Sequence, residues 1–406
     1  MAVCAHILRE APVTLWKLSS RERCRRVLRQ AGVTAIVDDL SSVKPDDSVL
    51  IVRGDYLFDG RVLHSLARSL NVVFQVPIGT SRAVVAAHVP ANLAAEASAM
   101  LSSEGHTAAL PGVSIEQLEG LLSSFNKSLR KSEPPFVVPI RAENKRALEE
   151  RLFSSSYRSV TDLVTKWVWP TPAQWVTRLC VAVGMRPNHV TMTSVVLVIV
   201  AATLFAKGSY GWGLAAAWVM TFLDTVDGKL ARVTVTSTRF GHFLDKILDL
   251  VHPPVWYLLW GVGLESFHPG IPSLTLNLAV WAIFIGYILG RLVEGAFQHL
   301  LGQYGIFCWR PFDSYFRLVT ARRNPNLILL TVSLGFSRPD LGLAAVTVWT
   351  AFSTLLLLVR LGTAVYARIT YGPLRSWLAD GIGHCGDRSL AVRLFTDRMP
   401  SSGSEA

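Results

Sequence analysis

The stretch DTVDGKLARVTVTSTRFGHFLDKILD, residues 224–249, places four aspartates inside an otherwise apolar part of the chain. Asp224 and Asp227 are three residues apart, and Asp245 and Asp249 are four apart, so on helices each pair shares one face. Two such helices side by side would bring the four carboxylates together. Ionised carboxylates at membrane depth are costly unless they bind metal or face water. The spacing therefore predicts a site for two metal ions, with oxygen ligands that suit Mg²⁺ or Mn²⁺.

Glycine, alanine and arginine also recur at fixed places in this stretch. The whole pattern is Asp224-x2-Asp227-Gly228-x2-Ala231-Arg232-x8-Gly241-x3-Asp245-x3-Asp249. In spacing and in all eight residue types it resembles the signature of the CDP-alcohol phosphotransferase family, and the resemblance covers about residues 185–360. It implies a membrane enzyme of phospholipid biosynthesis that cleaves a CDP-alcohol such as CDP-diacylglycerol. The phosphoalcohol, for example phosphatidyl, passes to a hydroxyl acceptor and CMP leaves.

The resemblance also implies a role for each motif residue. Asp224, Asp227 and Asp245 bind metal, while Asp249 is the general base and a further metal ligand. Glycine and alanine keep the helices close and leave room for the nucleotide, and the arginine contacts its phosphate. Family members often carry a motif like Pro187-Asn188-x2-Thr191, although helix initiation by proline explains it equally well. The residues expected to bind the nucleotide are Gly228, Ala231, Arg232, Gly241, Asn188 and Thr191.

Four basic residues fall at the predicted cytoplasmic ends of spans: Lys229, Arg239, Lys246 and Arg291. They are candidates for binding an acceptor phosphate, as in relatives that use inositol phosphate. The alternative is that they only anchor helices at the membrane surface. An inositol phosphate or related polyol is thus one hypothesis for the acceptor, and the sequence does not decide it.

Composition sets the architecture. Of 406 residues 50% are hydrophobic and 17% charged, with a mean hydropathy of +0.36, which is too apolar for a soluble protein and too charged for a wholly membrane one. The net charge is +11, and the basic residues flank apolar segments, which favours an anionic membrane surface over nucleic acid. The five cysteines lie far apart and form no disulfide framework.

Residues 1–135 are expected to form a cytosolic, doubly wound α/β domain with a parallel sheet. The predicted strands are 33–37, 49–52, 72–76 and 83–89, and the predicted helices 20–31, 61–70, 91–103 and 114–130. The order resembles a sugar-nucleotide cytidylyltransferase, with Gly54-Asp55 in the place of that family's metal-binding pair. The glycine-rich phosphate loop is missing, however, since the first glycine is Gly32.

We therefore expect a degenerate, silent nucleotidyltransferase-like domain that binds a substrate or partner or supports a dimer. A chain beginning near residue 143 should then keep phosphotransfer. The alternatives are a bifunctional enzyme whose first domain makes the CDP-alcohol and, from another class, a non-catalytic membrane scaffold or transporter. Four intact aspartates disfavour a scaffold, and the absence of an internal repeat disfavours a transporter.

Residues 136–183 are expected to be a linker, hinged at 126–146, and amphipathic helices on the membrane surface, with Trp167, Trp169 and Trp175 as interfacial aromatics. Residues 184–370 should form an all-α domain of six transmembrane helices, and 371–406 a basic cytosolic tail. The apolar stretches that predict the six spans are 191–206, 212–223, 243–262, 276–292, 326–336 and 341–359. The fifth is short and should either extend back through Leu318 and Val319 or be shielded within the helix bundle.

Arginine and lysine set the orientation. The loops expected outside contain two basic residues, Lys207 and Arg338, whereas the loop at 293–325 and a tail counted from Arg360 contain ten. Both termini and the aspartate motif are therefore expected on the cytoplasmic side of an inner, cytoplasmic membrane. Family members are commonly homodimers, and Gly286-x3-Gly290 is either a dimer contact or packing within one subunit.

Overall fold

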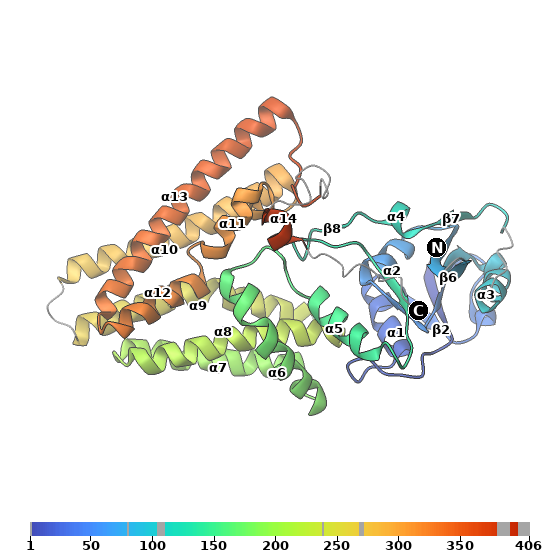
Figure 1. Cartoon of the computed structure of the whole chain (residues 1–406), viewed down its shortest axis with the longest axis horizontal. Helices are drawn as coiled ribbons and strands as arrows, with labels where there is room; N and C mark the ends of the chain where they lie inside the picture. The colour runs from blue at the N-terminus through green and yellow to red at the C-terminus, as the bar shows by residue number, and fades with distance from the viewer. Residues whose placement is uncertain are drawn as a thin grey trace. The chain divides into compact units, whose positions relative to one another are not determined.

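In this computed structural model the described residues are 2–78, 81–103, 110–237, 239–267, 272–379 and 390–396, without the side chains of 119, 121, 239, 240, 242, 244, 246, 267 and 273. The chain forms two units (Figure 1). The first comprises Met1–Ser124, Pro134–Ser156 and Arg232–Thr236, and the second Phe125–Glu133, Tyr157–Ala231 and Ser237–Ala406. The first unit thus extends past the boundary expected at residue 135.

A six-stranded mixed sheet forms the centre of the first unit. Its strands are β1 (Val3–Leu8), β2 (Ala35–Val37), β3 (Ser48–Arg53), β5 (Val72–Ile78), β6 (Ser81–Pro90) and β7 (Ser114–Glu116), in the order β2-β1-β3-β6-β5-β7. β6 is antiparallel to both neighbours, and the other pairs are parallel. The prediction of a wholly parallel sheet is therefore wrong at β6. Only residues 79 and 80 separate β5 from β6, whereas a parallel crossover needs a dozen or more residues.

Helices cover both faces of this sheet, as the doubly wound prediction requires. Successive residues of a strand point to opposite faces. Leu50 and Val52 of β3 accordingly pack in the cluster of α1 (Ser20–Gln30) and α2 (Gly60–Leu66). Val49 and Ile51 pack with α3 (Ala94–Ser102) on the other face. α1 begins at Ser19, whose side chain accepts a hydrogen bond from the amide of Glu22.

Two segments differ from the sequence prediction. The helix expected over 114–130 is replaced by β7, the short α4 (Leu118–Leu121) and β8 (Phe125–Asn126). The expected hinge at 126–146 is ordered: β8 pairs with β9 (Lys131–Ser132), and β10 (Val137–Pro139) pairs with β4 (Tyr56–Phe58). α5 (Lys145–Ser155) completes the first unit, where Trp16 donates hydrogen bonds to Glu149.

The second unit is helical. Its helices are α6 (Pro170–Ala182), α7 (Pro187–Ala206), α8 (Tyr210–Val233), α9 (Arg239–Phe267), α10 (Ser273–Ala296), α11 (Pro311–Val319), α12 (Arg323–Gly335), α13 (Pro339–Tyr371) and α14 (Leu390–Phe395), with π-helical turns at Val164–Val168 and Phe297–Gly302. α7 to α10, α12 and α13 share one apolar core that includes Phe205, Trp256 and Trp260. Of the expected interfacial tryptophans, Trp167 and Trp175 are exposed, but Trp169 packs edge-on against Trp218 and Phe222 of α8.

Four stretches of the described helices are long and apolar enough to cross a membrane: Pro187–Ala206, Ile247–Ser266, Leu274–Gly302 and Pro339–Tyr371. α12 has 13 residues, about 20 Å, which is short of a hydrocarbon core of about 30 Å. Its expected extension through Leu318 and Val319 is wrong, because α11 ends there and α12 begins at Arg323. Arg360 and Arg368, expected in the tail, lie within α13.

Gly286 and Gly290 of α10 face α13, which lies alongside it in Figure 1. A Cβ on Gly286 would lie 2.8 Å from Thr350 Cγ2 and 3.1 Å from Thr354 Oγ1. Thr354 Oγ1 donates a 3.0 Å hydrogen bond to the Gly286 carbonyl. The small-xxx-small pattern therefore serves packing within the subunit.

We expect Gly286→Ala to lower the thermal unfolding midpoint of the detergent-purified chain, because overpacking at this crossing costs about 1–3 kcal/mol. Gly295→Ala, on the same helix, is the matched control, because nothing lies within 4 Å of its added Cβ. Equal midpoints for the two variants would show that α10 and α13 do not depend on this close approach.

Candidate metal centre

Three of the four motif aspartates converge between α8 and α9. Asp224 and Asp227 of α8 and Asp245 of α9 each present a carboxylate oxygen, and these oxygens all lie within 4.8 Å of one another. Asp227 is buried and the other two are partly buried. An all-oxygen donor set of this size fits a hard divalent cation such as Mg²⁺ or Mn²⁺. Asp249 is not part of this group of three.

Thr191 orients one of these carboxylates from a third helix. Its hydroxyl, one turn into α7, donates a 2.8 Å hydrogen bond to Asp227 Oδ2. Thr191 is buried, so its hydroxyl and the carboxylate oxygen satisfy one another away from water. The sequence placed Thr191 at the nucleotide pocket, and the structure places it directly against a candidate metal ligand.

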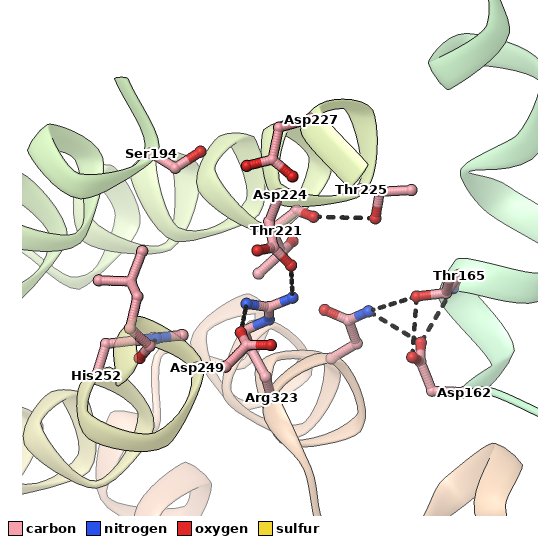
Figure 2. Close-up of polar contacts among 12 residues, drawn as sticks. Asp162, Thr165, Ser194, Thr221, Asp224, Thr225, Asp227, Asp249, His252 and Arg323 are labelled. Carbon is pink, nitrogen blue, oxygen red and sulfur yellow. Dashed lines mark hydrogen bonds and ion pairs between the residues drawn. The ribbon is translucent and has the colours of Figure 1, made fainter. Parts of the chain in front are cut away.

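Arg323, in the first turn of α12, bridges the two halves of the motif (Figure 2). Its guanidinium donates to Asp224, and Nη1 donates to Asp249 Oδ1 at 2.8 Å. The sequence interpretation counted Arg323 only as a basic loop residue. The sequence nevertheless offered a clue to this role. Four clustered carboxylates need a compensating cation, and few basic residues border the short fifth span, so Arg323 was a candidate partner.

A polar network fixes the start of α12 beside Arg323. Asn324 Nδ2 donates to Asp162 Oδ1 at 2.9 Å and to Thr165 Oγ1 at 3.2 Å (Figure 2). Thr165 in turn donates to both oxygens of Asp162, through its amide and its hydroxyl. Asp162 and Asn324 are buried, so this network orients the helix turn that carries Arg323.

Proline chemistry fixes the backbone at Asp249. Pro253 and Pro254 lie inside α9, and a proline lacks the N–H that would bond the carbonyl four residues earlier. For Pro253 that carbonyl belongs to Asp249. Tyr287 of α10 donates its hydroxyl to this carbonyl at 3.0 Å and accepts a 3.3 Å hydrogen bond from Arg291.

The other expected nucleotide-binding residues are distributed around this centre. Asn188 is exposed at the start of α7. Gly228 and Ala231 of α8 and Gly241 of α9 are partly buried. Arg232 donates a 3.2 Å hydrogen bond to the carbonyl of Ser156.

The expected acceptor-binding residues do not form one group in the described structure. Lys229 is buried, with Nζ 3.2 Å from the centre of the Tyr157 ring. Arg291 contacts Tyr287. The side chains of Arg239 and Lys246 lie outside the described residues.

A different basic group surrounds Glu294 of α10. Arg322 forms an ion pair with Glu294, and Arg130, Arg291 and Arg317 act on the same carboxylate electrostatically. Arg317 and Arg322 also lie over Phe307, 5.5 and 5.9 Å from the ring centre. Nε and Nη1 of Arg317 are buried, with no hydrogen-bond partner in the described part of the chain. The sequence did not single out this group.

Comparison with known proteins agrees with the motif. Residues 185–301 match the family model described as CDP-alcohol phosphatidyltransferase. This stretch, which contains the whole carboxylate motif, is therefore a domain of that type, and the resemblance inferred from the sequence is confirmed for it.

Curated relatives match over the same region. The phosphatidylinositol phosphate synthase of Mycobacteroides abscessus is 33% identical over 115 residues, which are 27% of this chain and 50% of the relative. That of Mycolicibacterium smegmatis is 27% identical over 132 residues, 32% of this chain and 60% of the relative. The archaetidylinositol phosphate synthase of Methanothermobacter thermautotrophicus is 29% identical over 80 residues, 20% of this chain and 41% of the relative. The chain thus spans about half the length of the curated relatives it matches.

Among solved structures, the Mycobacterium tuberculosis phosphatidylinositol phosphate synthase with CDP-DAG bound has 20% identity and a TM-score of 0.36, covering 47% of this chain and 94% of that one. The same enzyme in complex with manganese and citrate has 22% identity and a TM-score of 0.37, covering 47% and 90%.

We expect Asp245→Asn to abolish release of CMP from a CDP-alcohol while the chain still inserts and folds, because a candidate metal ligand is lost without a change of size. Asp46→Asn, at an exposed position of the first unit, is the control. Initial rates in detergent measure the effect. Activity within roughly tenfold of wild type would contradict the assignment, since losing a ligand typically costs more.

We expect Tyr287→Phe to lower turnover several-fold, because it leaves the partly buried carbonyl freed by Pro253 without its donor, at about 1 kcal/mol. The exposed Tyr366→Phe on α13 serves as control. Steady-state kinetics should show a fall in kcat with little change in KM for the CDP-alcohol. Unchanged kcat would mean that Asp249 does not need this support.

Proposed function

We propose that this protein is an integral membrane CDP-alcohol phosphotransferase that transfers a phosphatidyl or similar phosphoalcohol group from a CDP-alcohol to a hydroxyl acceptor and releases CMP. The observation that carries the proposal is the convergence of Asp224, Asp227 and Asp245 on two adjacent helices of the segment that matches the family model. The active site and both termini face the cytoplasm in this proposal, with six spans built from α7 to α10, α12 and α13.

The carboxylates of Asp224, Asp227 and Asp245 would hold two divalent ions, with Asp249 as a further ligand; Mg²⁺ or Mn²⁺ would neutralise pyrophosphate charge and stabilise the leaving phosphate. Asp249 takes the proton of the acceptor hydroxyl. The hydroxyl oxygen attacks the phosphorus that carries the lipid alcohol, and the bond from that phosphorus to the CMP oxygen breaks. The hydrogen bond from Arg323 Nη1 holds the Asp249 carboxylate in place for this role.

An acceptor with its own phosphate fits the basic group around Glu294. Four arginines act electrostatically on the Glu294 carboxylate, of which Arg322 forms an ion pair with it, and Nε and Nη1 of Arg317 are buried without a hydrogen-bond partner among the described residues. Arginine is well suited to phosphate because its planar fork donates two parallel hydrogen bonds. We therefore propose an inositol phosphate or related polyol phosphate as the acceptor, bound by this group of arginines, which includes Arg291.

The first unit is proposed to be catalytically silent as a cytidylyltransferase. Both carboxylate oxygens of Asp55 accept hydrogen bonds from Arg53, at 3.0 and 2.6 Å, so this carboxylate is already neutralised. Close packing is sufficient to explain the glycine at position 54, since a Cβ on Gly54 would lie 2.6 Å from the Arg9 carbonyl oxygen. A homodimer is also proposed, with its contact elsewhere than Gly286 and Gly290.

The test is CMP release by the full-length chain in proteoliposomes that contain CDP-diacylglycerol. We expect turnover with Mg²⁺ or Mn²⁺ and inositol phosphate, slower turnover with unphosphorylated inositol, no turnover in EDTA, and recovery when metal is added back. Full turnover in chelator would refute the two-metal mechanism. No CMP release from any CDP-alcohol, with the chain folded and metal present, would refute the proposed function.

A further inference from the structure

The turn between α8 and α9 joins the two halves of the carboxylate motif. Asp224 and Asp227 precede it on α8, and Asp245 and Asp249 follow it on α9. The first half of this turn does not belong to the helical unit: residues Arg232–Thr236 are part of the first unit, with the α/β sheet. The segment that sets the spacing of the motif is thus packed by the N-terminal part of the chain.

Two arginines of α1 hold this turn by its backbone. Arg23 Nη2 donates a 2.6 Å hydrogen bond to the carbonyl of Val233 and a 3.3 Å one to the carbonyl of Leu15. One turn along the same helix, Arg26 Nη1 donates at 2.8 Å to the carbonyl of Thr234. The partners are separated by 210 and 208 residues in sequence. Both contacts are to main-chain atoms, so they fix the path of the chain.

These contacts are strong for a physical reason. Val233 is the last residue of α8, and the last carbonyls of a helix lack partners within it and carry its negative partial charge. Arg23 is only 5% exposed. Its burial lowers its pKa to about 10, which leaves the guanidinium charged at neutral pH. A charged donor on a helix C-terminus stabilises that end.

Other features of the turn agree with a restrained path. Val235 has a φ of 51°, in the left-handed region that a β-branched residue rarely adopts. Next to the residues that these arginines contact, Arg232 of α8 donates a hydrogen bond to the carbonyl of Ser156, the C-cap residue of α5. Backbone in so unfavourable a conformation persists only where its surroundings hold it.

We propose that Arg23 and Arg26 are positioning residues for phosphotransfer, which hold the α8–α9 turn so that the aspartates of α8 and α9 meet. The α/β unit is then a required support of the reaction and not a dispensable attachment. This inference rests on the proposed function. It reverses the sequence-based expectation that a chain beginning near residue 143 keeps activity, because such a chain lacks both arginines.

The test uses full-length variants in detergent. Arg26→Ala, Arg23→Met and the double variant remove the contacts, and Arg29→Ala, exposed on the last turn of α1, is the matched control. We expect faster amide hydrogen exchange at residues 233–236, a kcat lower by about 10- to 100-fold, and a higher divalent-ion concentration for half-maximal rate. Arg26→Lys should restore part of each, because its ammonium also donates to a carbonyl.

The readouts separate positioning from general stability. If the exchange at 233–236 and the metal dependence of the variants equal those of Arg29→Ala, the inference is overturned. Should Arg23→Met fail to fold, the partly exposed Arg26→Ala decides alone. If the wild-type chain releases no CMP, the proposed function fails, and the exchange measurement still decides whether the two arginines hold the turn.

Discussion

The repulsion among the three carboxylates of Asp224, Asp227 and Asp245, held together by α8 and α9, is the constraint that organises the helical unit. Like charges at this separation in a poorly solvated place are costly, and a cation must compensate them. In the structure Arg323 does so by reaching Asp224 on α8 and Asp249 on α9. The start of α12 at Arg323 and the buried network of Asp162 and Asn324 beside it place that guanidinium.

A second theme is support of the site through main-chain atoms. The carbonyl of Asp249 is freed by Pro253 and taken by Tyr287, and the carbonyls that end α8 are taken by arginines of α1. Side chains that bind substrate or metal can then turn toward the reaction, because the backbone beneath them is already fixed. Preorganisation of this kind is what holding reactants in productive geometry requires.

Sequence patterns predicted those parts that depend on neighbours along the chain. Spacing on a helix brought Asp224 beside Asp227, and long apolar runs located α7 and α10 close to their observed bounds and the start, but not the end, of α13. Contacts across long sequence separations were missed: Arg323 lies 74 and 99 residues from its two partners and looked like any basic loop residue. β1 was missed because VCAHIL is short and interrupted by a histidine, whose ring contacts the Val37 carbonyl at the sheet. The direction of β6 was wrong because apolar strands look alike whichever way they run.

The arginine on α1 has a consequence for how the protein is made. The ribosome completes Arg23 210 residues before it completes Val233, and in that interval α1 and the whole sheet are already outside the exit tunnel. The first unit includes residues Arg232–Thr236, so its last contacts form only after the chain has been made beyond the end of α8. The first unit is therefore not an independent N-terminal block, because residues more than two hundred positions after α1 complete it.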